Sequence, residues 1–109
     1  MKHYLNSDQT MRLKDIGFPS PKGVSKLSLD WDMDTVPTFN YSIGELIEFL
    51  PKEIKKDNTL VEVLNICSNG DSWEVYYTDY TFTGSYQLRV ELIDALYDMI
   101  IELKEKKVI

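Results

Sequence analysis

The chain has 109 residues, of which 43% are hydrophobic and 28% are charged, and its formal net charge is -6. This length suits one domain with one core, and the composition excludes a disordered chain. An acidic chain repels nucleic acid phosphates unless its basic residues cluster, so we expect no direct binding of DNA or RNA.

The first predicted element is a short helix within SDQTMRLKDIGFP. Ser7 is placed as its N-cap, Gly17 supplies a left-handed residue at its end, and Pro19 prevents continuation. Two short strands follow in KLSLDW and VPTFNY. The alternation of Leu27, Leu29 and Trp31 with polar residues predicts a half-buried strand. The second strand contains Pro37, which has no amide hydrogen, so we expect it at a sheet edge.

The segment YSIGELIEFLP gives the strongest helix signature in the chain. Ser42 and Glu45 match the S-x-x-E capping box, and Tyr41 and Leu46 are spaced for a hydrophobic staple. Pro51 limits the end of this helix. The pattern therefore predicts a helix whose start and stop are both fixed by local residues.

The segment TLVEVLNICSNGDSWEVYYTDYTF predicts a β-hairpin with strands at Leu60–Cys67 and Trp73–Tyr80. Asn69 and Gly70 would form a type I′ turn between them. The last segment, SYQLRVELIDALYDMIIELKEKKVI, predicts the longest helix. Its apolar stripe recurs at spacings of four and three: Leu88, Leu92, Leu96, Ile100 and Leu103.

The order helix, two strands, helix, two strands, helix predicts a single α+β domain over residues 1–109. Because hairpins imply antiparallel pairing, we expect a small antiparallel sheet of two hairpins with three helices packed on it. The first ten residues contain no apolar signal core, and no apolar run reaches the ~20 residues that cross a bilayer. We expect a soluble, cytoplasmic protein without membrane contact.

Four stretches together resemble a family of small proteins encoded in bacteriophages and prophages of gut Bacteroidales. They are LNSDQTMRLKDIGFP, WDMDTVPTFNYSIGELIEFLP, SWEVYY and LIDALYDMIIELKEKKVI, and they span nearly the whole chain. The resemblance carries no catalytic residue to this sequence. It implies a phage or mobile-element gene product that acts inside a bacterial host cell.

Asp30, Asp32 and Asp34 are the one pattern that suggests bond chemistry. DMDTV matches the nucleophile motif of haloacid-dehalogenase-type phosphatases, but that motif follows a continuously apolar parallel strand, and KLSL alternates instead. An EF-hand loop starting at Asp30 fails because its sixth and twelfth residues are Thr35 and Tyr41. We expect a polar turn between two strands, and weak cation binding there stays open.

Two isolated residues, His3 and Cys67, are of types that can bind a metal or act as a nucleophile. His3 has no second histidine or cysteine near it in the sequence, so we expect no metal site. Cys67 is the only cysteine, which excludes an internal disulfide. Because Cys67 ends a predicted strand among apolar neighbours, we expect it to be buried and unreactive.

The aromatic strand SWEVYYTDYTF gives the second functional signal. Alternation places two sets on opposite faces: Trp73, Val75 and Tyr77 on one, and Glu74, Tyr76 and Tyr80 on the other. If the first set enters the core, the second lies on the exposed face, where tyrosines are typical of protein interfaces. The alternative is that tyrosine is simply a good strand former.

The function favoured by these patterns is a non-enzymatic interaction protein of a phage or mobile element, with a host or phage protein as its partner. The candidate interface residues are Glu74, Tyr76 and Tyr80, and we expect no cofactor. One alternative is an acidic mimic of nucleic acid that inhibits a host defence enzyme. Another is a metal-dependent phosphoesterase that uses the three aspartates. The sequence leaves open whether the protein is a monomer or a homodimer.

Overall fold

A computed structural model of the chain describes residues 1–55, 60–79 and 83–109. Within this part the helices are α1 (Ser7–Asp15), α2 (Ile43–Phe49) and α3 (Leu92–Glu105). The strands are β1 (Val24–Leu29), β2 (Thr35–Phe39), β3 (Glu53–Lys55), β4 (Val61–Ser68), β5 (Trp73–Thr78) and β6 (Thr83–Arg89). The predicted α+β class, with three helices and antiparallel hairpins, is confirmed.

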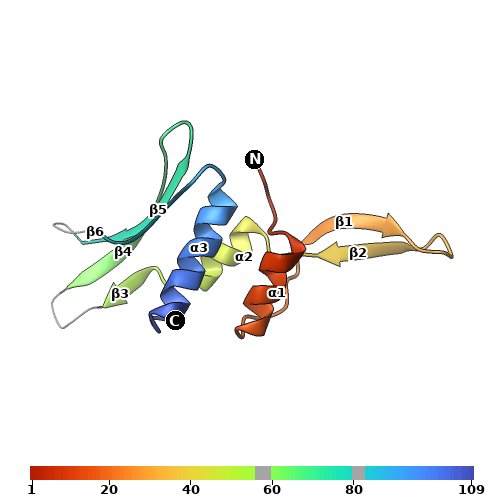
Figure 1. The fold of residues 1–109 in the computed structure, drawn as a ribbon, viewed down its shortest axis with the longest axis horizontal. Coiled ribbons are helices and arrows are strands. Elements are labelled where there is room, and N and C mark those ends of the chain that lie inside the picture. Colours follow the sequence, from red (N-terminus) through yellow and green to blue (C-terminus); the bar gives the residue numbers. More distant parts are fainter. Residues whose placement is uncertain (56–59, 80–82) are drawn as a thin grey trace.

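The strands form two separate antiparallel sheets. β1 and β2 make a two-stranded hairpin, here called the arm, and β3, β4, β5 and β6 pair in that order. Figure 1 shows the four-stranded sheet at one end, the helices in the middle and the arm projecting from the other end. The molecule is correspondingly elongated, with extents of 60 × 32 × 17 Å.

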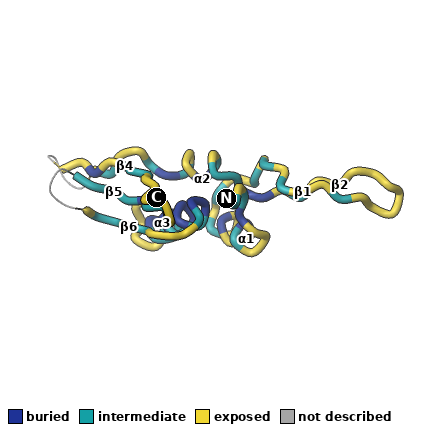
Figure 2. The backbone as a smooth tube through the Cα atoms, turned by 90° about the horizontal axis from the view of Figure 1, so that it is seen from above, coloured by how far each residue is buried: buried dark blue, intermediate teal, exposed yellow. Residues whose placement is uncertain are grey.

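The core lies around α3, which packs against β5, β6 and α2. Its predicted stripe from Leu92 to Leu103 is buried, together with Ala95 and Met99 between its members. From the sheet, Val75 and Tyr77 are fully buried against this helix. The alternation of β5 predicted that they share a face but left open which face is buried. Figure 2 shows the buried backbone concentrated at the helices, whereas the arm is mostly exposed along its length.

The helix starts follow local capping chemistry. In α2 the predicted capping box is present: Ser42 Oγ accepts from the Glu45 amide, and the Glu45 carboxylate accepts from the Ser42 amide. In α1 the predicted N-cap Ser7 is wrong by one residue, because Asn6 is the cap. Asn6 Oδ1 accepts from Gln9 N at 2.8 Å, and Gln9 Oε1 accepts from Asn6 N at 3.1 Å.

The last helix starts later than its apolar spacing predicted. Residues 83–89 form β6, and Leu88 is paired with Glu74 in the sheet, not placed in the helix stripe. Its side chain is 42% exposed. Leu88 precedes Leu92 by four residues, which fits a helix period but also places it on one side of an alternating strand.

The turn between β4 and β5 also differs from the prediction. Gly70 has a φ of 99°, but Asn69 does not have a positive φ, so a type I′ turn is excluded. The loop instead contains four residues, closed by a 3.1 Å bond from Asn69 N to Ser72 O. The Asn69 side chain completes it, because Oδ1 accepts from Ser72 N at 2.9 Å.

Gly84 lies so close to Glu62 that we expect any side chain at position 84 to destabilise the fold. A Cβ on Gly84 would overlap the Glu62 carboxylate, and Glu62 is only 3% exposed. We expect Gly84→Ala to lower the free energy of unfolding by about 1–3 kcal/mol, as overpacking does, measured by urea denaturation. Gly44→Ala in α2 is the matched control, since nothing lies within 4 Å of its Cβ. That substitution should stabilise by about 0.5–1 kcal/mol. Equal effects of the two substitutions would contradict the clash.

The buried hydroxyl of Tyr77 leads to a prediction about how the stability of the fold depends on pH. Its hydroxyl donates to Pro51 O at 2.6 Å, and burial raises its pKa above the ordinary 10.0. The folded state therefore keeps a proton that the unfolded chain loses, so this contribution is present at neutral pH and is lost as the pH rises above 10. We expect Tyr77→Phe to cost about 1 kcal/mol at pH 7 and to weaken the alkaline loss of stability in thermal melts. An alkaline loss unchanged by the substitution would show that Tyr77 is not its source.

Candidate protein interface

The four-stranded sheet has one face against α3 and an opposite face, here called the outer face. The register places Asn65, Tyr76 and Tyr86 in one row across β4, β5 and β6. A second row contains Cys67, Glu74 and Leu88. Because neighbouring rows alternate with the buried residues Val75 and Tyr77, all six belong to the outer face.

The two tyrosines of the outer face form a contiguous aromatic surface. The rings of Tyr76 and Tyr86 have centroids 6.0 Å apart and are tilted by 35°. Tyr86 donates to Glu74 Oε1 at 2.7 Å, and Cys67 Sγ lies 3.9 Å from the Tyr76 hydroxyl. These contacts restrict the two tyrosine side chains, and side chains that are already ordered lose less entropy if they bind a partner.

The same contacts favour the neutral phenols. The hydrogen bond between Tyr86 and the Glu74 carboxylate raises the pKa of Tyr86, because the neutral phenol is the donor. The pKa of Tyr76 is raised first by its contact with Cys67. Both hydroxyls therefore stay protonated at neutral pH. The single proton of Tyr86 is donated to Glu74, so its oxygen is left as a hydrogen-bond acceptor.

The sequence predicted part of this surface. Glu74 and Tyr76 lie on the outer face as expected, whereas Tyr80 lies outside the described residues. Tyr86 was missed because its segment was assigned to the last helix. The alternation of Tyr86, Leu88 and Val90 along the chain was the available signal for a strand.

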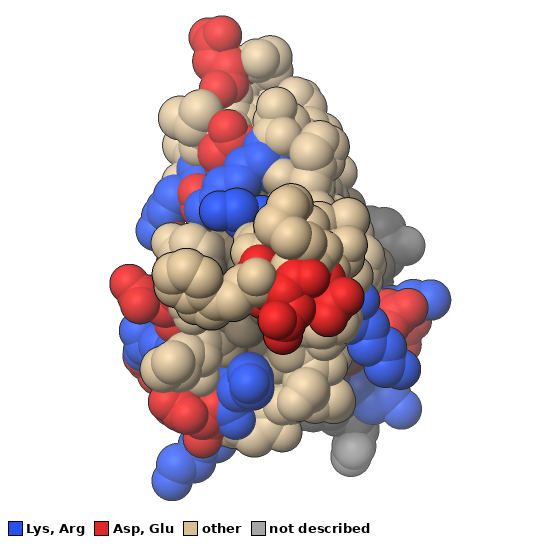
Figure 3. All heavy atoms as spheres, turned by 90° about the vertical axis from the view of Figure 1, so that its right-hand side faces the viewer, with Lys and Arg blue, Asp and Glu red and all other residues tan. Residues whose placement is uncertain are grey.

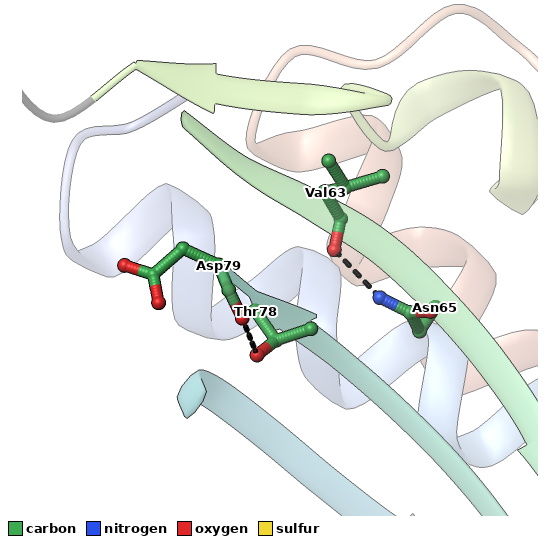
Figure 4. Close-up of a pocket in the computed structure, with 4 residues that line it drawn as sticks. All are labelled: Val63, Asn65, Thr78 and Asp79. Carbon is green, nitrogen blue, oxygen red and sulfur yellow. Dashed lines mark hydrogen bonds between the residues drawn. The ribbon is translucent and has the colours of Figure 1, made fainter. Parts of the chain in front are cut away.

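A shallow hollow of about 210 Å³ lies further along the outer face, lined by Val63, Asn65, Thr78 and Asp79. Figure 4 shows its two internal contacts. Asn65 Nδ2 donates to Val63 O at 2.9 Å, and Thr78 Oγ1 donates to Asp79 O at 2.6 Å. Its walls present one apolar and three polar side chains, which suits contact with a mixed protein surface better than enclosure of a small molecule.

The prediction that Cys67 is buried is wrong: its side chain is exposed on the outer face. Leu64 and Ile66 pack against the core, so the next residue along β4 faces the other way. Apolar neighbours in sequence are therefore on the opposite side of the sheet from the thiol.

The exposed thiol allows the accessibility of the outer face to be measured by its reaction with a thiol reagent. We expect one equivalent of a thiol reagent such as DTNB to react per folded chain without denaturant, because Cys67 is accessible. The release of thionitrobenzoate measures the reaction. Reaction only after unfolding in guanidinium would contradict the exposure of Cys67, and Cys67→Ser is the blank.

The three aspartates lie at the tip of the arm, between β1 and β2, and all are exposed. One carboxylate oxygen from each lies within 4.8 Å of the others. Asp30 Oδ1 accepts from the amides of Asp32 at 2.9 Å and Asp34 at 2.8 Å, so it stabilises the turn. Figure 3, seen from the end where the arm lies, shows acidic side chains gathered among uncharged ones.

The expectation of a polar turn between two strands is thus confirmed. The segment DMDTV follows an exposed antiparallel strand, whereas the phosphatase motif needs a buried parallel strand. The turn closes by bonds from Met33 N to Asp30 O and from Asp30 N to Asp34 O, with Met33 at a φ of 64°. This is a three-residue hairpin loop with a bulge.

The arm departs from its prediction in burial. Leu27, Leu29 and Trp31 were expected to be half-buried, but they are 64%, 61% and 101% exposed. The strand forms as predicted, yet it extends beyond the core, so no element of the described chain covers its apolar face. That face also contains Val24, Pro37 and Phe39.

Comparison with known proteins gives no relative: no protein-family model, no curated protein and no solved structure matches the chain. Among the described residues, no helix is both long enough and apolar enough to cross a lipid bilayer.

Proposed function

We propose that this chain is a non-enzymatic interaction module that binds another protein through the outer face of its four-stranded sheet. The observation that carries the proposal is the paired tyrosines, Tyr76 and Tyr86, held by Glu74 and Cys67 on a sheet face that no helix of the described chain covers. The resemblance to phage proteins points to a bacterial or phage protein as the partner.

The chemistry of the outer face supports a protein partner. Tyrosine is enriched among the residues that dominate binding energy, because it offers a large apolar ring and a hydrogen-bonding hydroxyl. Leu88 and Val63 add apolar area and are 42% and 47% exposed. Glu74 stands among them, and its charge favours a partner with basic side chains at the matching position.

The proposal is tested by crosslinking from a defined position. A photoreactive amino acid replaces Leu88 on the outer face, and the purified protein is irradiated in lysate of a gut Bacteroidales host. A control protein carries the same group at Met11 of α1, which is 63% exposed. We expect one protein to be crosslinked from position 88 and not from position 11, identified by mass spectrometry.

Substitutions then measure the contribution of the tyrosines. We expect Tyr76→Ser and Tyr86→Ser each to weaken binding of the captured protein by about tenfold or more, as interface hot spots do, measured by calorimetry. Met11→Ser is the control, because it removes a large exposed apolar side chain from α1, away from both the outer face and the arm. Equal loss for all three variants, or none for the tyrosines, would overturn the proposal. A captured protein that binds nucleic acid and releases it to this chain would instead favour mimicry.

A further inference from the structure

The arm is exposed along its length, but its root makes several hydrogen bonds to the rest of the chain. Asn40 is 7% exposed and accepts from Thr10 Oγ1 at 2.7 Å. It also donates to Ser25 Oγ at 2.8 Å and, from its backbone, to Gly23 O at 3.0 Å. The Glu45 carboxylate accepts from the amide of Gly23 at 3.2 Å while it caps α2. The root of the arm is therefore tied to both α1 and α2.

The two edges of the arm differ in the backbone hydrogen-bonding groups that they expose. The bond between Asp30 N and Asp34 O fixes the alternation of the ladder, so Leu27–Pro37 and Leu29–Thr35 are non-hydrogen-bonded pairs. In such pairs the backbone N–H and C=O groups point away from the paired strand, toward the free edges of the arm. The edge of β1 thus presents the amides and carbonyls of Leu27 and Leu29, whereas the edge of β2 lacks one donor at Pro37.

We propose that the arm pairs with the arm of a second copy of this chain, β1 against β1 in antiparallel orientation, with Ser28 on the two-fold axis. This inference does not depend on the proposed function, because it concerns the opposite end of the molecule. Among the residues that the structure describes, β1 pairs with no strand other than β2.

Charge complementarity selects this register. With Ser28 on the axis, Lys26 of one copy lies directly opposite Asp30 of the other, and symmetry repeats the pair. Lys26 and Asp30 are both exposed and lie on the same side of β1. Opposite charges at such positions stabilise a ladder, and they are closest in non-hydrogen-bonded pairs such as this one. Leu27 of each copy meets Leu29 of the other.

Pro37 explains why such pairing would stop at two copies. The joined sheet has the order β2, β1, β1, β2, so both free edges belong to β2. Each of these edges lacks the amide hydrogen of Pro37, which discourages a third strand. Four strands also exceed the two of an isolated hairpin, which is marginally stable in water. The two-fold arrangement therefore closes.

The test uses the full chain and its oligomeric state. Sedimentation equilibrium should show a reversible dimer of the unmodified protein. Leu29→Pro removes an outward amide from β1, whereas Thr35→Pro makes the same change at the paired position on the β2 edge. We expect Leu29→Pro to raise the dimer dissociation constant at least about tenfold and Thr35→Pro to leave it nearly unchanged. Lys26→Glu should also weaken the dimer, with Lys14→Glu in α1 as control.

A disulfide provides a second readout, which reports on the geometry of the pairing. In a Cys67→Ser background, Ser28→Cys should form a dimer on mild oxidation, because facing non-hydrogen-bonded residues have Cα atoms about 4.5 Å apart, within the range of a disulfide. Val36→Cys, on β2 opposite Ser28, should stay monomeric. A monomer at all concentrations, or equal crosslinking of both variants, would overturn the proposal. Circular dichroism checks that each variant is folded.

Discussion

Among the residues that the structure describes, helix α3 supplies eight of the fifteen side chains in the buried core, and it lies between the four-stranded sheet and α2. The other helices are too short to bury a sheet by themselves, since α1 has nine residues and α2 has seven. A helix buries one stripe and a sheet one face, so a chain with one long helix can cover only one side of one sheet. The outer face and the arm are what this constraint leaves uncovered.

The outer face and the arm are held in place by different interactions, the first by packing in the core and the second by hydrogen bonds. The outer face is the back of strands whose other side chains, Val75 and Tyr77, are locked in the core. The arm has no core beneath it, and its position rests on the buried polar contacts of Asn40 and on the Glu45 carboxylate. Buried polar contacts fix direction more than they add stability, since each bond replaces one made to water.

Sequence signals succeeded where the cause is local. Ser42 and Glu45 predicted the start of α2, and the alternation around Val75 predicted which residues of β5 share a face, because caps and pleats depend on neighbours in the chain. They failed where the outcome depends on the rest of the fold. The alternation of Leu27 and Leu29 shows that one face of β1 is apolar, but not whether a core is available to cover it. Of the candidate interface, Glu74 and Tyr76 were predictable, whereas the contact of Tyr76 with Tyr86 depends on the pairing of β5 with β6.

The separation of the two surfaces has a consequence for binding. The arm and the four-stranded sheet lie at opposite ends of an elongated molecule, with the helices between them (Figure 1). A dimer joined at the arms would therefore leave both outer faces free and far apart. Two linked sites raise the effective concentration of the second after the first has bound, provided that the partner's sites match their spacing. An outer face of modest affinity would then discriminate between a partner with repeated sites, such as an oligomer, and one with a single site.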